Sequence, residues 1–172
     1  MSAFADFDEY ARARWLPLLR TATLLTGDRH AAEDLVQDAL ARAAQRWTVI
    51  AEADSPDAYV RRILYTRSID TWRRTRHEPT ASAHVGWATT SADTAAATDT
   101  RVTLEAALRR LTSKQRAVLV LRFYEDRSEV ESARILGCSV NTVKSQTRHA
   151  LGRLRELAPE LADTFGRQEV GR

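Results

Sequence analysis

The sequence predicts an all-α protein made of two small helical domains joined by a flexible linker. Apolar residues recur at three- and four-residue spacing in both halves of the chain, which is the period of one helix face. Between the halves, residues 77–100 are dominated by alanine, threonine and serine. Glycine and proline are scarce, at 6 and 4 of 172 residues. This disfavours a β-sandwich or β-barrel, which needs many turns.

The composition excludes several classes of protein. The chain is 44% apolar and 28% charged, with a net charge of +3, which is typical of a soluble globular protein. Its longest apolar run is Ala117–Leu121, whereas a membrane span needs about 20 apolar residues. Residues 1–6 show no secretory signal. The single cysteine, Cys138, allows no internal disulfide, so we expect a reducing, cytoplasmic setting.

The first predicted domain covers residues 1–76 and contains three expected helices. The first is expected to end near Gly27, and Asp28 is the predicted N-cap of the second. Ser55 and Pro56 predict the start of a third helix, from about 56 to 75, because proline is tolerated at the first helical position. The apolar stripe of the second helix comprises Ala32, Leu35, Val36, Ala39, Leu40, Ala43 and Trp47.

Residues 77–100 are interpreted as the linker. Alanine, threonine and serine fill 15 of these 24 positions, and such a segment buries too little apolar surface to offset the entropy of ordering. Trp87 is the exception and is a candidate docking contact. Halves of 76 and 72 residues are short for independent stability. We therefore expect each to gain stability from a partner or from the other half.

The second predicted domain covers residues 101–172 and has three successive helix starts. Thr112 with Gln115 and Ser128 with Glu131 form capping boxes, and Ser139 can cap a third helix. Gly137 lies between the last two helices, where glycine closes a helix and turns the chain. This arrangement predicts a helix-turn-helix at residues 128–151.

The last predicted helix has a polar face without carboxylates, opposite a buried stripe of Val140, Val143, Ala150, Leu151 and Leu154. Its side chains carry donors for phosphates and base edges, which favours DNA binding. An ordinary helical hairpin would explain the caps but not the lack of acids. The face comprises Asn141, Thr142, Lys144, Ser145, Gln146, Arg148 and His149.

Residues 59–76 form a second basic zone, with a net charge of +5. Arginines are interleaved there with Tyr59, Tyr65 and Trp72, a mixture that suits single-stranded or melted nucleic acid. The alternative is a helix whose aromatic residues belong to the core and whose arginines are solvated. The arginines are Arg61, Arg62, Arg67, Arg73, Arg74 and Arg76.

The polar face of the second helix carries Asp34, Gln37, Asp38 and Arg42. No cleft or histidine cluster accompanies these carboxylates, so a solvated or protein-contact face is favoured over catalysis. The chain has no phosphate-loop, dinucleotide, zinc-protease or serine-hydrolase signature, and its four histidines and one cysteine lack zinc spacing. We therefore expect no enzyme activity, no metal and no cofactor.

Four stretches in this order carry a family resemblance: residues 26–42, 59–63, 111–122 and 136–147. They resemble the extracytoplasmic-function sigma factors, and most of all the actinobacterial SigE-type group. The resemblance implies a transcription initiation factor with a sigma-two-like and a sigma-four-like domain. Its implied partners are core RNA polymerase, through the β′ clamp and the β flap, and promoter DNA. An anti-sigma factor is a further candidate partner.

The resemblance also implies roles for individual residues. Asp34, Gln37, Asp38 and Arg42 match the surface for the polymerase β′ clamp helices. The implied contacts with the minus-ten element are Tyr59, Arg61, Arg62, Thr66, Arg67, Trp72, Arg73 and Arg74. The implied contacts with the minus-thirty-five element are Arg122, Asn141, Thr142, Lys144, Ser145, Gln146, Arg148 and His149.

Two other classes compete with this reading. A free-standing helix-turn-helix regulator of duplex DNA would not need the arginine and aromatic zone at 59–76 or the Asp34 and Asp38 face. A protein-binding adaptor would not need the acid-free face of the last helix.

Overall fold

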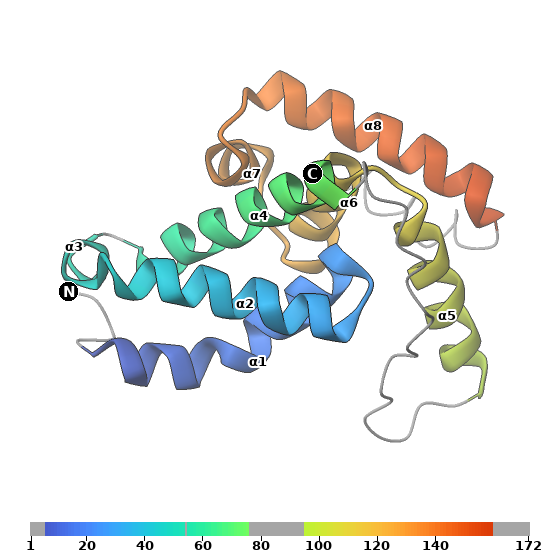
Figure 1. The fold of residues 1–172 in the computed structure, drawn as a ribbon. Coiled ribbons are helices and arrows are strands. Elements are labelled where there is room, and N and C mark those ends of the chain that lie inside the picture. The colour runs from blue at the N-terminus through green and yellow to red at the C-terminus, as the bar shows by residue number, and fades with distance from the viewer. Residues whose placement is uncertain (1–5, 54, 76–94, 160–172) are drawn as a thin grey trace.

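The computed structural model describes residues 6–53, 55–75 and 95–159; the side chains of 72–75 and 95–101 lie outside the described part. Within these ranges the chain is helical and has no strand, which confirms the predicted all-α class (Figure 1). The elements are α1 (Phe7–Thr26), α2 (Arg29–Ala44), α3 (Trp47–Ala51), α4 (Pro56–Thr75), α5 (Ala95–Arg109), α6 (Ser113–Leu119), the π-helical turn η1 (Val120–Tyr124), α7 (Glu129–Leu136) and α8 (Val140–Leu157).

The predicted helix ends of the first half are confirmed. Gly27 closes α1 in the left-handed conformation, with φ of 74°. The Asp28 carboxylate accepts a hydrogen bond from the Ala31 backbone N–H and so caps α2. Ser55 accepts one from the Ala58 N–H at the start of α4. Asp28 and Ser55 each satisfy a backbone donor that the first turn leaves without a helical partner.

The caps of the second half also follow the prediction. Thr112 with Gln115 and Ser128 with Glu131 form reciprocal capping boxes at α6 and α7. Gly137 has a φ of 66° and ends α7, after which the Ser139 side chain accepts a hydrogen bond from the Thr142 N–H. The short turn between α7 and α8 is therefore specified locally by its own residues.

Two predicted boundaries were wrong. Helix α5 begins at Ala95, inside the stretch interpreted as linker, because alanine has the highest helix propensity and residues 95–97 are all alanine. Helix α2 ends at Ala44, and Trp47 begins the separate helix α3. The Trp47 ring packs edge-on against Phe7, with 5.4 Å between ring centroids. Trp87 and the predicted domain boundary between residues 76 and 77 both lie outside the described residues. The docking role of Trp87 and the position of that boundary therefore stay predictions.

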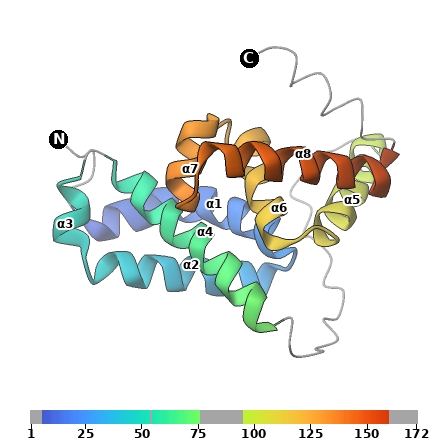
Figure 2. The ribbon, with the colours of Figure 1, turned by 90° about the horizontal axis from the view of Figure 1, so that it is seen from above.

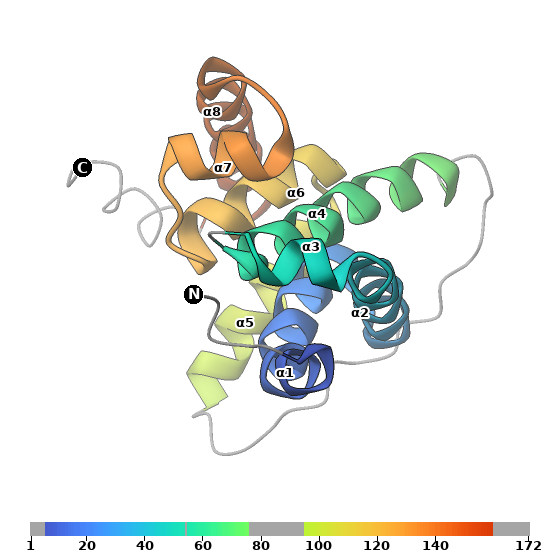
Figure 3. The ribbon, with the colours of Figure 1, turned by 90° about the vertical axis from the view of Figure 1, so that its left-hand side faces the viewer.

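One hydrophobic core joins the two halves of the chain. Fully buried Leu18 and Leu64 of the first half belong to the same cluster as Leu121 and Ile135 of the second. A second cluster lies mainly among α5, α6 and α8. Helix α4 packs between α2 on one side and α6 and α7 on the other (Figures 1 and 3). The halves are therefore in contact, which is one of the two arrangements expected from their short lengths.

Helix α8 runs along α6 toward α5, as the view from above shows (Figure 2). Val143, Ala150, Leu151 and Leu154 are buried along this path, as predicted, whereas Val140 is only half-buried. The apolar stripe of α8 is therefore used for packing, and its opposite face is left for other contacts.

A buried arginine also ties the halves together. Arg116 of α6 is 5% exposed, and its guanidinium donates to the backbone carbonyl of Leu25 at 2.6 Å. The last turn of α1 has no basic residue of its own, so Arg116 supplies the positive charge that a helix C-terminus favours. Burial, with a smaller contribution from Arg109, lowers the pKa of this guanidinium, which still stays charged at neutral pH.

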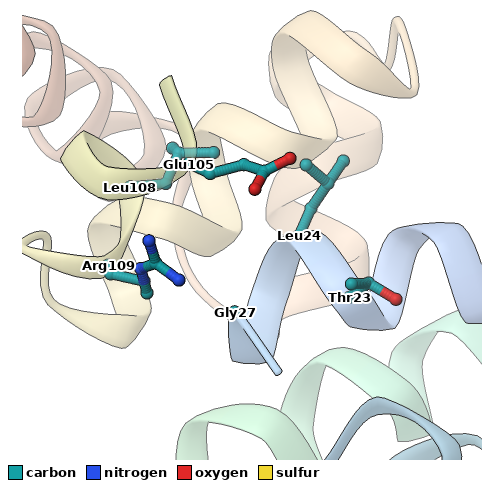
Figure 4. Close-up of a pocket in the computed structure, with 6 residues that line it drawn as sticks. All are labelled: Thr23, Leu24, Gly27, Glu105, Leu108 and Arg109. Carbon is teal, nitrogen blue, oxygen red and sulfur yellow. The ribbon is translucent and has the colours of Figure 1, made fainter. Parts of the chain in front are cut away.

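Helix α5 meets the end of α1 beside this contact. Figure 4 shows Glu105, Leu108 and Arg109 facing Leu24 and Gly27. A Cβ atom at position 27 would lie 2.8 Å from Cγ of Arg109. Glycine is thus required there twice over, for its positive φ and for the close approach of α5.

Candidate nucleic-acid and protein interfaces

Helices α7 and α8 form the predicted helix-turn-helix. Ala133 is buried where the two helices meet, and Val143 is fully buried at the start of α8. The turn between them comprises Gly137, Cys138 and Ser139. Burial raises the pKa of the Cys138 thiol, which disfavours a reactive thiolate and fits a structural role.

The predicted polar face of α8 is open to solvent. Asn141, Thr142, Lys144, Arg148 and His149 are exposed, and Ser145 and Gln146 are half-buried. The Ser145 hydroxyl donates to the Thr142 carbonyl at 3.1 Å. This face therefore offers amide, ammonium, guanidinium and imidazole groups along one side of a capped helix.

Two contacts of this region were not anticipated. Lys144 Nζ lies 3.6 Å from the Glu129 carboxylate of α7, so an acid adjoins a face that has none of its own. Arg122 is half-buried, and its guanidinium donates to the backbone carbonyl of Arg127. Arg122 thus braces the turn after η1, while its position next to the helix-turn-helix remains compatible with the predicted phosphate contact.

The basic zone of α4 divides between two sides of the helix. Arg62 and Thr66 are exposed, and Tyr59 and Arg67 are half-buried at its rim. Tyr65 is fully buried in the core, so the stacking role considered for it was wrong. Trp72, Arg73 and Arg74 lie in the last turns of α4, where the side chains fall outside the described part.

Arg61 points toward the second half of the protein rather than to solvent. Its guanidinium pairs with Asp57 of α4 at 2.7 Å and with Glu125, the residue after η1. Burial alone would lower the pKa of Arg61, but Glu125 and Asp57 outweigh it and hold the pKa above its ordinary value. In this arrangement Arg61 is a contact between the halves and is not available to DNA.

The predicted polar face of α2 is present and exposed at Asp34, Gln37 and Arg42. Asp38 is half-buried and pairs with Arg42 at 3.0 Å and with Arg67 of α4 at 2.7 Å. Burial would raise the pKa of Asp38, but hydrogen bonds from the two arginines outweigh it and lower the pKa. The carboxylate is thus ionised and joins the α2 face to α4.

The described residues contain no group of three or more histidine, cysteine or acidic side chains placed to hold a metal ion. None of the described helices combines the length and apolar character that crossing a membrane would require.

Two family matches cover both halves of the chain. Residues 12–78 match Sigma-70 region 2, and residues 101–154 match Sigma-70 region 4. RNA polymerase sigma-E factor of Streptomyces avermitilis is 40% identical over 88% of this chain and 84% of its own length. ECF RNA polymerase sigma factor SigL of Mycobacterium tuberculosis is 33% identical over 93% of this chain and 90% of its own length.

The chain is an extracytoplasmic-function sigma factor. A similar solved structure is the sigma factor RpoE from Bartonella quintana, in complex with the anti-sigma factor NepR. It is 25% identical, with a TM-score of 0.70, and the match covers 91% of this chain and 98% of that one. This sigma factor therefore has its region 2 in α1–α4 and its region 4 mainly in α5–α8.

The contacts between the halves escaped sequence analysis. The Thr21 hydroxyl donates to Glu125, 104 residues away, at 2.8 Å, and Arg116 reaches Leu25 across 91 residues. No local pattern marks such partners, since neither capping nor periodicity depends on them. The one available signal was the shortness of each half, which predicts contact but not its residues.

Proposed function

We propose that this sigma factor acts through three surfaces, each on a different helix. The exposed face of α8 reads the minus-thirty-five element, α4 opens the minus-ten element, and the polar face of α2 docks on the β′ clamp of core polymerase. The observation that carries the proposal is the capped helix-turn-helix with an exposed, donor-rich second helix.

For the minus-thirty-five element, α8 enters the major groove, which is wide enough for one helix. Lys144, Arg148 and His149 are exposed and carry donors for phosphates and base edges. Asn141 and Gln146 add amides that can pair with adenine edges. The predicted contacts with the DNA backbone are completed by Arg122, Thr142 and Ser145.

For the minus-ten element, we propose that α4 meets melted DNA at Tyr59, Arg62, Thr66 and Arg67. Flipping a base out of the stack costs a few kcal/mol, which stacking and a pocket must offset. The predicted set also includes Arg61, Trp72, Arg73 and Arg74. Arg61 can join this surface only after it leaves Glu125.

The α2 face of Asp34, Gln37, Asp38 and Arg42 is proposed as the docking surface for the β′ clamp, with the β flap as a second contact for region 4. The exposed carboxylate of Asp34 and the half-buried one of Asp38 would attract basic residues on the polymerase. On this proposal the protein works in the cytoplasm and supplies recognition without catalysis of its own. By likeness to the RpoE structure, an anti-sigma factor is a further proposed partner.

Footprinting on a responsive promoter tests these assignments. With core polymerase and the sigma factor together, we expect protection at both elements and permanganate-reactive thymines within the minus-ten element. An Arg148→Ala variant should lose the minus-thirty-five protection first. Protection of a palindromic duplex site by the sigma factor alone, without strand opening, would instead favour the free-standing regulator.

A further inference from the structure

Lys144 and Glu129 form an ion pair between the two helices of the helix-turn-helix. Helix α7 packs against the N-terminal part of α8 (Figures 1 and 2), and Lys144 Nζ lies 3.6 Å from Oε2 of Glu129. Both side chains keep contact with solvent, since Lys144 is 54% exposed and Glu129 is 36% exposed. The pair therefore lies at the surface, beside the face of α8 that is proposed to meet DNA.

A carboxylate at this place opposes the function proposed for the surface around it. In a helix-turn-helix the second helix enters the major groove while the first crosses the phosphate backbone. Glu129 is the first residue of that first helix, and a negative charge beside phosphates weakens the binding of any duplex. The start of α7 does not depend on this carboxylate, because Glu131 already completes its capping box. The contact with Lys144 is the interaction that gives the charge of Glu129 a use.

The geometry of the pair leaves Lys144 able to bind DNA at the same time. A nitrogen-to-oxygen distance of 3.6 Å is longer than an ordinary hydrogen bond of about 2.7–3.2 Å. The three N–H donors of a lysine ammonium can therefore turn to a phosphate while Glu129 restrains the position of the nitrogen. Lysine otherwise has a flexible four-carbon stem that lets its charge follow many acceptors. Glu129 thus limits the phosphates that Lys144 reaches without breaking the pair.

We infer that Glu129 determines specificity for the minus-thirty-five element by positioning Lys144. On the matching element, base contacts fix α8 in the groove, and Lys144 reaches its phosphate without leaving Glu129. On other sequences α8 settles differently, so Lys144 must break the pair before it reaches a phosphate. The pair therefore weakens binding to wrong sequences more than binding to the right one. The inference rests on the proposed role of α8 in reading this element.

Glu129→Gln tests the inference because it keeps the size of the side chain and removes the charge that holds Lys144. Glu156→Gln is the matched control, since Glu156 forms an ion pair with Arg153 within α8 itself, at 2.6 Å. The measurement is the affinity of core polymerase with the sigma factor for two fluorescent duplexes. One is a promoter that the sigma factor transcribes, and the other is the same promoter with its minus-thirty-five element scrambled. The ratio of the two affinities is compared, because an electrostatic effect common to both duplexes cancels in it.

We expect Glu129→Gln to reduce the preference for the intact promoter by about two- to fivefold, which is the range that exposed ion pairs supply. Glu156→Gln should leave the preference unchanged. In a Lys144→Ala background, Glu129→Gln should also leave it unchanged, because the lysine that Glu129 holds is gone. An unchanged preference in Glu129→Gln, or the same reduction with and without Lys144, would overturn the inference and leave the proposed function intact. Equal binding of both promoters by the wild-type complex would instead overturn the proposed function, and the inference with it.

Discussion

Asp38 on α2 accepts a hydrogen bond from Arg67 on α4 at 2.7 Å. One carboxylate thereby joins the surface proposed for polymerase docking to the helix proposed for promoter opening. A basic group of the polymerase that competes for Asp38 would release Arg67 toward DNA. If both proposed roles hold, docking and promoter contact would be coupled through this one side chain.

Asp38→Arg should abolish binding to core polymerase, because it reverses the charge of the docking face and repels Arg42 and Arg67. Co-purification of the full-length variant with core polymerase measures this. Asp34→Arg is the companion variant, since Asp34 is exposed and forms no ion pair with α4 among the described residues. Retained polymerase binding by both variants would show that the docking face is assigned wrongly.

Lys144→Ala should weaken DNA binding by the polymerase complex on all sequences and make it less sensitive to salt. Each phosphate contact releases counterions, so the loss of one contact should lower the slope of log affinity against log salt by about one. Titrations at several salt concentrations give this slope. A slope equal to that of the wild type would mean that Lys144 touches no phosphate.

Gly27→Ala should destabilise the fold by about 1–2 kcal/mol, because alanine is strained at positive φ. The clash of its Cβ with Arg109 should add to that loss. Gly152→Ala is the control: Gly152 lies inside α8 with open space around it, and alanine there should stabilise by about 0.5–1 kcal/mol. Urea unfolding measures both. Equal effects of the two substitutions would contradict the described cap.

Asp57 should make the fold sensitive to acid. Burial would raise its pKa, but Arg61, Arg14 and the Tyr10 hydroxyl outweigh it and lower the pKa. The pKa of this carboxyl is lower in the folded protein than in the unfolded chain, where it is about 4. Its full contribution to the free energy of unfolding is therefore present above about pH 4. That contribution is lost as the pH falls through the pKa of the folded state.

Asp57→Asn should therefore be less stable at neutral pH and should lose less stability on acidification. The free energy of unfolding between about pH 6 and pH 2 measures this difference. Parallel pH profiles for the variant and the wild type would contradict the ion-pair cluster around Asp57.

The local features of this protein could be predicted from its sequence, and the contacts between its halves could not. Asp28, Gly137 and the capping boxes act within a few residues, so their chemistry is visible in the sequence. Tyr65 and Arg61 differ because their surroundings come from the other half. A buried tyrosine and a stacking tyrosine look alike in a helical sequence, and only tertiary packing separates them.

The candidate interfaces also contain features that the local sequence predicts and contacts that depend on tertiary packing. The exposed face of α8 follows from its apolar stripe, because burying one side of a helix leaves the other side in solvent. The pairing of Asp38 with Arg67 depends on how α2 packs on α4, which no spacing reveals. Helix α5 was not predicted, because burial and not helix propensity was considered for residues 77–100.

Run-off transcription with core polymerase, with and without this protein, tests the central claim most directly. The templates are a pool of upstream sequences from the genome that encodes the protein. We predict start sites that appear only when the protein is present, and these sites should share a minus-ten and a minus-thirty-five motif. The same start sites with and without the protein, together with failure to co-purify with core polymerase, would contradict the account.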